Sequence, residues 1–216
     1  GLVISDGSRV LEYKDVAIGE VWLCSGQSNM AFMLKETGDT SSVCSDPDLR
    51  FFDMKARWNT NNRRWSDDAI AAVQRLEYYH KASWTKCTDS AAKSFSAVGY
   101  WYGRRLREAL GVPVGLICNA IGGSTTESWI DRQTLETRFP AILKDWLHND
   151  FTQAWARKRA ARNIGAPDSG ASRHPYEPCY LFESGIIPLD RYSIAGVIWY
   201  QGESNVTRAN QYKESF

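Results

Sequence analysis

The stretch EVWLCSGQSNMAF, residues 20–32, decides how the rest of the sequence is interpreted. It begins as a short apolar run, which is typical of a strand buried inside a parallel sheet. The run passes directly into Ser-Gly-Gln-Ser-Asn, so Ser28 is expected on a turn at the end of that strand. A serine in this place either caps the helix that follows or is a nucleophile presented at the edge of the sheet. The motif alone does not separate these two interpretations.

The composition is that of an ordinary globular chain. The 216 residues are enough for one domain, or for one domain and part of another. A hydrophobic content of 43% with 24% charged residues excludes a disordered or fibrous protein. The net charge of +1 gives no reason to expect a nucleic-acid partner, and the basic run ARKRAAR (156–162) is interpreted as the solvated face of a helix. No apolar stretch approaches the roughly 18 residues of a membrane span, so none is expected.

The five cysteines do not suggest a metal site. They are widely spaced, with neither a C-x-x-C pair nor paired histidines nearby, and we expect no bound metal. Cys24 and Cys118 lie in apolar runs and are expected to be buried as small hydrophobic residues. Cys44 and Cys87 lie in polar surroundings, and the sequence leaves open whether they form a disulfide.

Apolar strands alternate with helical segments along the chain. A hairpin is expected around Asp6-Gly7, and a helix is expected from the Ser96 cap to Gly111. Further strands are expected at 20–26, 49–54, 114–123 and 194–204, and further helices at 131–164, in two segments that meet at Phe139-Pro140, and from 208 onward. Residues 165–180 are expected to form a loop. This alternation predicts an α/β fold with a parallel sheet, in which ligands bind beyond the carboxyl ends of the strands.

Three polar loops follow three of the apolar strands. We call them the first motif (GQSNM, 26–30), the second motif (GGSTTESW, 122–129) and the third motif (QGESN, 201–205). In a parallel sheet all three lie at one edge. Ser28 offers a hydroxyl, and Gly122 and Gly123 offer backbone N–H groups that a ligand can approach closely. Gln201 offers an amide and Glu203 a carboxylate, and a nucleophile with several donors aimed at one point is what acyl transfer requires.

The segments EVWLCSGQSNM, GGSTTESW and VIWYQGESN, in this order, resemble the sialate O-acetylesterase branch of the SGNH hydrolases, and acetylxylan esterases are similar. The resemblance extends from about Asp6 to the end of the chain and is weak from 131 to 180. It implies a flavodoxin-like three-layer α/β sandwich with a parallel sheet, incomplete at its C-terminal side. It also implies a serine esterase that removes acetyl groups from a carbohydrate without a metal or organic cofactor. A secreted or periplasmic location is implied as well, although the sequence shows no signal peptide.

Carried over by motif, the resemblance makes Ser28 the nucleophile, rather than its neighbour Ser25. It makes Gly123, or in the second place Gly122, the donor of an oxyanion N–H. Gln201 is implied as a further donor, with Asn205 as its competitor. Four more polar residues are expected to support these groups or to contact the sugar, namely Gln27, Asn29, Glu127 and Glu203.

The resemblance leaves the general base unassigned. The family carries its Asp and His in one Asp-x-x-His motif after the Gln-Gly-Glu block, and no such motif follows the third motif here. We therefore expect the base and its aspartate to lie outside this chain, and we expect the chain alone to be inactive or weak. His174, in a proline-flanked loop that is expected at the surface, is a weaker candidate. Asp145 and His148 also spell Asp-x-x-His, but they precede the third motif and fall in an expected helix. His80 is expected to be structural or exposed.

The resemblance also suggests how the chain is organised. Residues 1–18 are expected to be a lead-in hairpin or the end of a preceding β-rich segment, and residues 19–216 to be a truncated esterase domain. A truncated sheet exposes an unpaired edge, so association between chains is expected. Two other functions stay open: a non-catalytic carbohydrate-binding module on an esterase scaffold, and a lipase or thioesterase. The lack of a G-x-S-x-G elbow argues against the α/β-hydrolase form of the latter.

Overall fold

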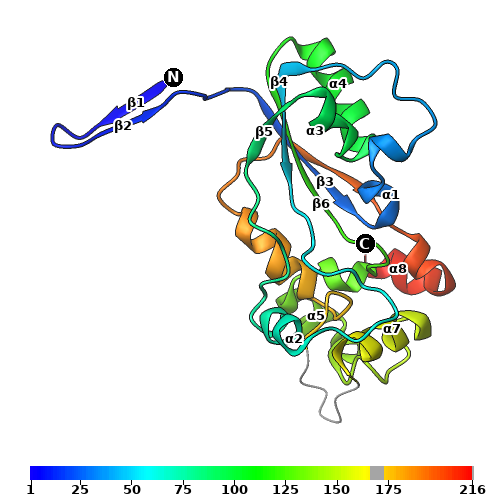
Figure 1. Cartoon of the computed structure of the whole chain (residues 1–216). Coiled ribbons are helices and arrows are strands. Elements are labelled where there is room, and N and C mark those ends of the chain that lie inside the picture. The colour runs from blue at the N-terminus through cyan, green and yellow to red at the C-terminus, as the bar shows by residue number, and fades with distance from the viewer. Residues whose placement is uncertain (166–172, 216) are drawn as a thin grey trace.

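The computed structural model describes residues 1–165 and 173–215 and is built on a five-stranded sheet in the order β5-β4-β6-β3-β7 (Figure 1). The strands are β3 (Glu20–Gly26), β4 (Asp46–Asp53), β5 (Trp84–Cys87), β6 (Val114–Ala120) and β7 (Gly196–Tyr200). β4, β6, β3 and β7 run parallel, which confirms the predicted α/β fold, whereas β5 pairs antiparallel with β4. β5 was not predicted, because four residues of mixed polarity carry no strand signal.

β3 lies inside the sheet, and its last four residues, 23–26, are buried. Leu23 packs with Ile117 and Met54 on one face, and Cys24 packs with Phe51 and others on the opposite face. Cys24 is in register with Cys118 of β6. Burial raises the pKa of the Cys24 thiol to about 12, so this thiol stays neutral, as the prediction of a buried small residue requires. The structure holds all five cysteines as free thiols, Cys44 and Cys87 included.

One face of the sheet is covered by α4 (Ala97–Leu110), with α3 (Asp89–Lys93) beside it (Figure 1). The predicted caps of α4 are confirmed. The Ser96 hydroxyl accepts the Gly99 N–H at 3.0 Å, and Gly111 ends the helix in the left-handed conformation at φ 67°.

The remaining helices gather mainly beyond the carboxyl ends of the strands, as Figure 1 shows for α2, α5 and α7. Their bounds are α1 (Ser28–Ala31), α2 (Asp67–Gln74), α5 (Arg132–Arg138), α6 (Pro140–Leu143), α7 (Ala154–Ile164) and α8 (Ala209–Ser215). An aromatic-rich core holds this end together, with Trp65, Tyr78, Trp129, Trp146, Tyr176 and Tyr180 among its members.

The prediction for residues 131–164 needs a correction. The junction at Phe139-Pro140 is confirmed, but the segment contains three helices instead of two. Residues 144–152 form turns and bends, and His148 lies there rather than in a helix. The expected loop at 165–180 falls partly on residues 166–172, which lie outside the described residues.

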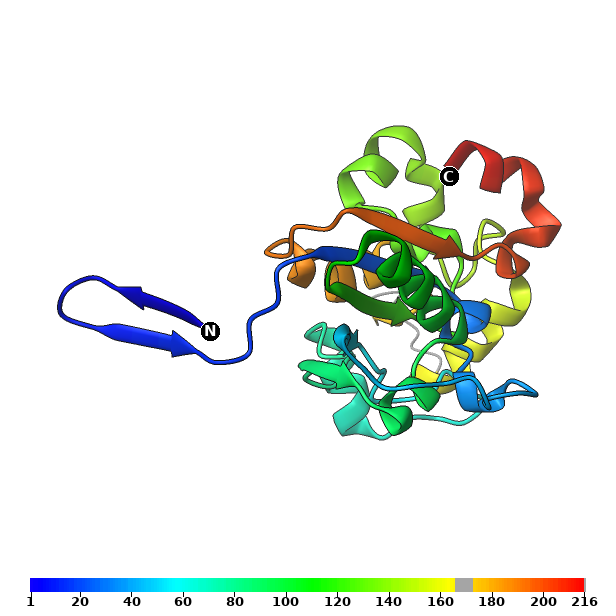
Figure 2. The same cartoon turned by 90° about the horizontal axis from the view of Figure 1, so that it is seen from above.

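The N-terminal residues form the hairpin predicted around Asp6-Gly7. β1 (Leu2–Ser5) pairs antiparallel with β2 (Val10–Tyr13), and both views show the pair standing away from the body of the molecule (Figures 1 and 2). All of its side chains are exposed. The assignment of residues 1–18 to a preceding β-rich segment stays a prediction.

β7 forms the edge of the sheet next to β3, and two of its large side chains, Val197 and Tyr200, are about half exposed. Association between chains through this edge stays a prediction. Over the described part of the chain, no helix combines the length and the apolarity that crossing a membrane demands.

Gly26 is a position at which the fold has no room for a side chain. Its φ is +138°, and a Cβ built on it would overlap the carbonyl oxygen of Tyr200. We expect Gly26→Ala to lower the free energy of unfolding by about 3 kcal/mol or more, because it adds backbone strain and a backbone clash. Urea denaturation measures this change. Gly38→Ala is the matched control, since no atom lies within 4 Å of its added Cβ; equal effects of the two substitutions would contradict the prediction.

Candidate active site

Ser28 stands exposed at the turn where β3 ends. It is the first residue of α1, and the N-cap position belongs to Gln27, whose side chain makes no capping hydrogen bond. Ser28 therefore does not cap the helix. Ser25, the nearest alternative, is buried, and its hydroxyl has no hydrogen-bond partner among the described residues. Of the two serines, only Ser28 is presented to a ligand.

The second motif lies opposite Ser28. A Cβ built on Gly122 would lie 3.8 Å from the Ser28 Cβ, so the two loops are neighbours. Gly123 has a φ of +76°, and a Cβ on it would overlap the Tyr176 hydroxyl. Within residues 1–165 and 173–215, no acceptor pairs with the backbone N–H of either Ser28 or Gly123. The turn thus leaves two N–H donors beside a serine hydroxyl.

These residues line an open cavity of about 600 Å³. Its other walls come from the loop after β4 and from α7, and they include Asn59, Thr60, Trp155 and Arg159. A volume of this size suits a small ligand. As far as the structure describes the chain, no histidine, aspartate or glutamate lines the cavity.

Tyr176 fixes two walls of this cavity to each other. Its hydroxyl donates to the Gly122 carbonyl oxygen at 2.8 Å and pairs with the Thr60 hydroxyl at 2.7 Å. The side chain is fully buried. It therefore holds the glycine turn in position against the loop that carries Thr60.

Gln201 of the third motif faces away from the cavity, into a buried network. Its amide nitrogen donates to the Ser124 carbonyl oxygen at 3.2 Å and to Asn205 Oδ1 at 2.7 Å, and its oxygen accepts from the Thr126 hydroxyl at 2.6 Å. The Thr126 N–H donates to the same Asn205 oxygen, which fixes the orientation of both amides. Both N–H groups of Gln201 are therefore already used. The structure connects Gln201 to the second motif without placing it in the cavity lining.

Asn205 and Glu127 continue this network. The Asn205 amide nitrogen donates to both oxygens of the Glu127 carboxylate, at 2.9 and 3.1 Å. Gln211 of α8 donates to the same carboxylate at 2.6 Å. Glu127 is fully buried, so its position is that of hydrogen-bonding support between the two motifs and α8. Glu127 is not among the residues that line the cavity.

The first motif is joined to the third motif as well. The Gln27 side-chain oxygen accepts the N–H groups of Gly202 and Ser204, at 3.4 and 3.3 Å. Asn29 donates to the carboxylate of Glu203, which is exposed. The three motifs therefore form one connected unit, as the prediction of a shared sheet edge requires.

His174 is buried rather than at the surface, which corrects the prediction for its loop. It stacks on Trp65 with ring centroids 5.1 Å apart, its Nδ1 accepts the Tyr176 N–H at 2.9 Å, and its Nε2 faces Asn163 Oδ1 at 3.2 Å. Burial lowers its pKa from 6.5 to about 3. Both ring nitrogens are occupied, and the residue does not line the cavity.

His148 and Asp145 do form a pair, with Nδ1 and Oδ1 2.7 Å apart. Both side chains are exposed on the turn after α6, and neither lines the cavity at Ser28. His80 is exposed, as expected. Throughout the described residues, no cluster of three or more histidine, cysteine, aspartate or glutamate side chains is placed to hold a metal ion.

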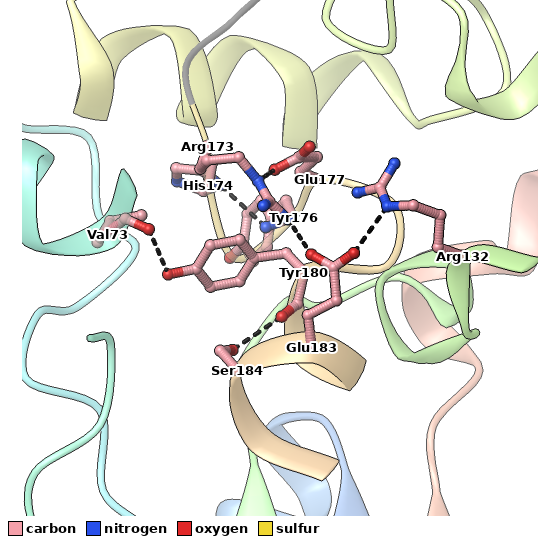
Figure 3. Close-up of polar contacts among 9 residues, drawn as sticks. All are labelled: Val73, Arg132, Arg173, His174, Tyr176, Glu177, Tyr180, Glu183 and Ser184. Atoms are coloured by element: carbon pink, nitrogen blue, oxygen red, sulfur yellow. Dashed lines mark hydrogen bonds and ion pairs between the residues drawn. The ribbon is translucent and has the colours of Figure 1, made fainter. Parts of the chain in front are cut away.

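An ion cluster anchors the segment that carries His174 and Tyr176, as Figure 3 shows. Arg173 pairs with Glu177 at 2.6 Å and with Glu183, and Glu183 also accepts from Arg132 of α5 at 2.8 Å. The segment is thereby tied to α5. Because Tyr176 belongs to this segment, the ion cluster also stabilises the part of the cavity wall that Tyr176 holds in position.

Arg159 is the site residue that sequence analysis missed. It lies in the basic run 156–162, which was interpreted as a solvated helix face, yet its side chain lines the cavity together with Trp155. The two residues are four positions apart on α7, so they lie on one helix face. The Trp-x-x-x-Arg spacing within this helix is the signal that was available.

Comparisons with known proteins agree with the motifs. A family model described as carbohydrate esterase, sialic acid-specific acetylesterase, matches residues 18–156. Sialate O-acetylesterase from Mus musculus is 29% identical over 211 residues, covering 90% of this chain and 37% of the mouse protein. The Homo sapiens protein is 29% identical over 212 residues, covering 91% and 33%. The chain thus spans about a third of the length of these curated relatives.

A solved structure shares the fold. A carbohydrate acetylesterase from Xanthomonas citri superimposes with a TM-score of 0.65 and 28% sequence identity. The match covers 99% of this chain and 40% of that chain. The α/β architecture described above is therefore that of a carbohydrate acetylesterase structure.

The buried His174 predicts a pH dependence of stability. Its pKa is about 3 in the folded chain, against an ordinary 6.5, so between these values the unfolded chain binds more protons. Stability contributed by the neutral ring is complete above pH 6.5 and is lost as the pH falls, by up to about 1.4 kcal/mol per pH unit.

We therefore expect His174→Phe, which keeps an aromatic ring against Trp65, to show a shallower loss of unfolding free energy between pH 6 and pH 4. Urea denaturation across this range measures the slope. His80→Gln, which removes an exposed histidine, controls for the loss of one histidine of any kind. Parallel slopes for wild type and His174→Phe would refute the prediction.

Proposed function

The chain belongs to the sialic acid-specific acetylesterase family of carbohydrate esterases, and from this premise we propose that it carries the nucleophile of a serine esterase that removes O-acetyl groups from a carbohydrate. One observation carries the proposal. The exposed Ser28 hydroxyl shares a cavity with Gly123, beside two backbone N–H groups that have no acceptor among the described residues.

The geometry fits acyl transfer in two steps. Ser28 Oγ attacks the acetyl carbonyl carbon while a general base takes the hydroxyl proton and later passes it to the leaving sugar oxygen. The negative charge that develops on the carbonyl oxygen is stabilised by the N–H groups of Ser28 and Gly123. The C–O bond to the sugar then breaks, and the sugar oxygen leaves with a proton. Water next attacks the acetyl group on Ser28, acetate departs, and the proton returns to the serine.

Gln201 takes a different part in this proposal from the one that the resemblance implies. Both of its N–H donors are used within the buried network, so the oxyanion is assigned to the two backbone N–H groups. Gln201 acts as a positioning residue that holds the second motif through Ser124 and Thr126.

The general base is proposed to come from outside these 216 residues. A serine nucleophile needs a base within hydrogen-bond reach, and no described residue of the cavity lining provides one. His174 has both nitrogens occupied, and His148 lies on an exposed turn. The cavity is open to solvent, which leaves access for a side chain from elsewhere.

The test of the proposal is acetate release by the protein at its natural length. We expect Ser28→Ala to reduce kcat/KM on O-acetylated sialic acid or acetylated xylan by at least about 10⁴-fold, because the nucleophile is lost. Ser25→Ala is the matched control and should retain release. Undiminished release from Ser28→Ala would refute the proposal, and saturable sugar binding without any release by wild type would favour a binding module.

The position of the base is tested by the same measurement on residues 1–216 alone. We expect a folded chain, checked by circular dichroism, with little or no acetate release. Release that disappears in Ser28→Ala would place the base within this chain and would contradict the assignment above.

The oxyanion assignment predicts a difference between two neighbouring glycines. Gly123→Ala places a Cβ against the Tyr176 hydroxyl at a φ of +76°, so the N–H must move. We expect kcat to fall by about 10²–10³-fold. Gly122→Ala meets nothing closer than the Ser28 Cβ at 3.8 Å and should change kcat by less than about tenfold. Steady-state kinetics on the protein at its natural length separates the two, and an equal loss would argue against the Gly123 N–H as donor.

A further inference from the structure

Arg159 is the one charged side chain among the described residues that line the cavity at Ser28. The cavity otherwise presents hydroxyl, amide, aliphatic and aromatic groups. A single cation with no carboxylate beside it dominates the electrostatic potential in this cavity, because the surrounding protein screens charge less than water does.

The Arg159 guanidinium has few polar partners within the described structure. No described carboxylate forms an ion pair with it, and its Nε is buried without a hydrogen-bond partner. Its one hydrogen bond is a long one, from Nη1 to the Tyr176 hydroxyl at 3.5 Å. Arg157, two residues earlier on α7, pairs with Asp150 at 2.8 Å and donates to the Thr152 carbonyl oxygen. Buried polar groups are normally paired, so the unpaired state of Arg159 points to a ligand.

Trp155 positions this guanidinium. The Arg159 Cζ lies 5.0 Å from the centre of the Trp155 ring, in a cation–π contact. Trp155 is itself held, because its indole N–H donates to Gln153 Oε1 at 2.9 Å, and Gln153 Nε2 donates to the Ser204 carbonyl oxygen at 2.5 Å. The charge is thus fixed in the cavity wall by the same polar contacts that connect α7 with the third motif.

We propose that Arg159 determines the specificity of this site by binding a carboxylate of the acetylated sugar. The inference rests on the proposed esterase function of the cavity. A guanidinium presents paired N–H donors that match a carboxylate, and the unsatisfied Nε is one of them. Since no second cation is found in the described lining, a singly charged carboxylate fits better than a doubly charged phosphate. The site then favours acidic acetylated sugars over neutral ones such as acetylated xylan.

Binding tests the charge recognition without depending on catalysis. The probes are N-acetylneuraminic acid and its methyl ester, which differ by one negative charge, and isothermal titration measures both dissociation constants with the whole chain. Wild type should bind the acid about ten- to a hundredfold more tightly than the ester. Arg159→Gln should bring this ratio close to one, and Arg159→Lys, which keeps the charge but loses the planar fork, should fall between them.

Arg162→Gln is the matched control, because it removes the same charge from the same helix at an exposed position outside the cavity lining. It should retain the wild-type ratio. The proposal is overturned if wild type does not distinguish the two probes, if Arg159→Gln keeps the preference in a chain shown to be folded, or if neither probe binds at millimolar concentration.

Kinetics then separates this inference from the esterase proposal. In the protein at its natural length, Arg159→Gln should lower kcat/KM for O-acetylated sialic acid about ten- to a hundredfold more than it lowers the value for the methyl ester, mainly through KM. An equal fall in kcat/KM for both substrates would overturn the role of Arg159 in specificity. It would leave the assignment of Ser28 as the nucleophile intact. Full activity of Ser28→Ala would instead refute the esterase proposal, and the binding ratio would still report on Arg159.

Discussion

The site depends on how closely the backbone of the first motif approaches β7. At Gly26 the chain leaves β3 with a φ of +138°, and there is no room for a Cβ beside Tyr200. The next residue, Gln27, donates its N–H to the Tyr200 carbonyl oxygen at 3.0 Å, and the Gly26 carbonyl oxygen accepts the N–H of Ile121 at 3.1 Å. The turn is thereby hydrogen-bonded to the chain at the ends of both neighbouring strands, β6 and β7, and this fixes where Ser28 enters the cavity.

Hydrogen bonds between side chains then hold the three motifs at fixed positions. Glu127, Asn205 and Gln201 are all buried, and each is satisfied by groups from another motif or from α8. A buried polar network of this kind is stabilising only when every member is paired, so its members have little freedom to turn toward a ligand. Most of the polar residues in the motifs therefore build the site, and the cavity itself is lined by Ser28, the two glycines, the loop after β4 and the side chains of α7.

Those parts of the fold that local patterns determine could be predicted from the sequence. The apolar run gave the bounds of β3, Glu20–Gly26, and the serine and glycine caps gave those of α4. The direction in which Gln201 points could not be predicted, because it depends on Ser124 and Asn205, which only the fold brings close. β5 was not predicted either, because it has too few residues to carry a periodic signal.

Arg159 illustrates a limit of arguments from overall charge. A net charge of +1 argues against a polyanionic partner for the surface as a whole, because surface charges of both signs screen one another. Inside a cavity the net charge of the whole chain does not matter. One guanidinium without an ion-pair partner, in partly desolvated surroundings, acts on a ligand only a few ångströms away. The same four-residue spacing that turns Trp155 into the cavity turns Arg159 there too. A basic run on a helix is therefore better analysed one helical face at a time, because a single face can decide which substrate the site accepts.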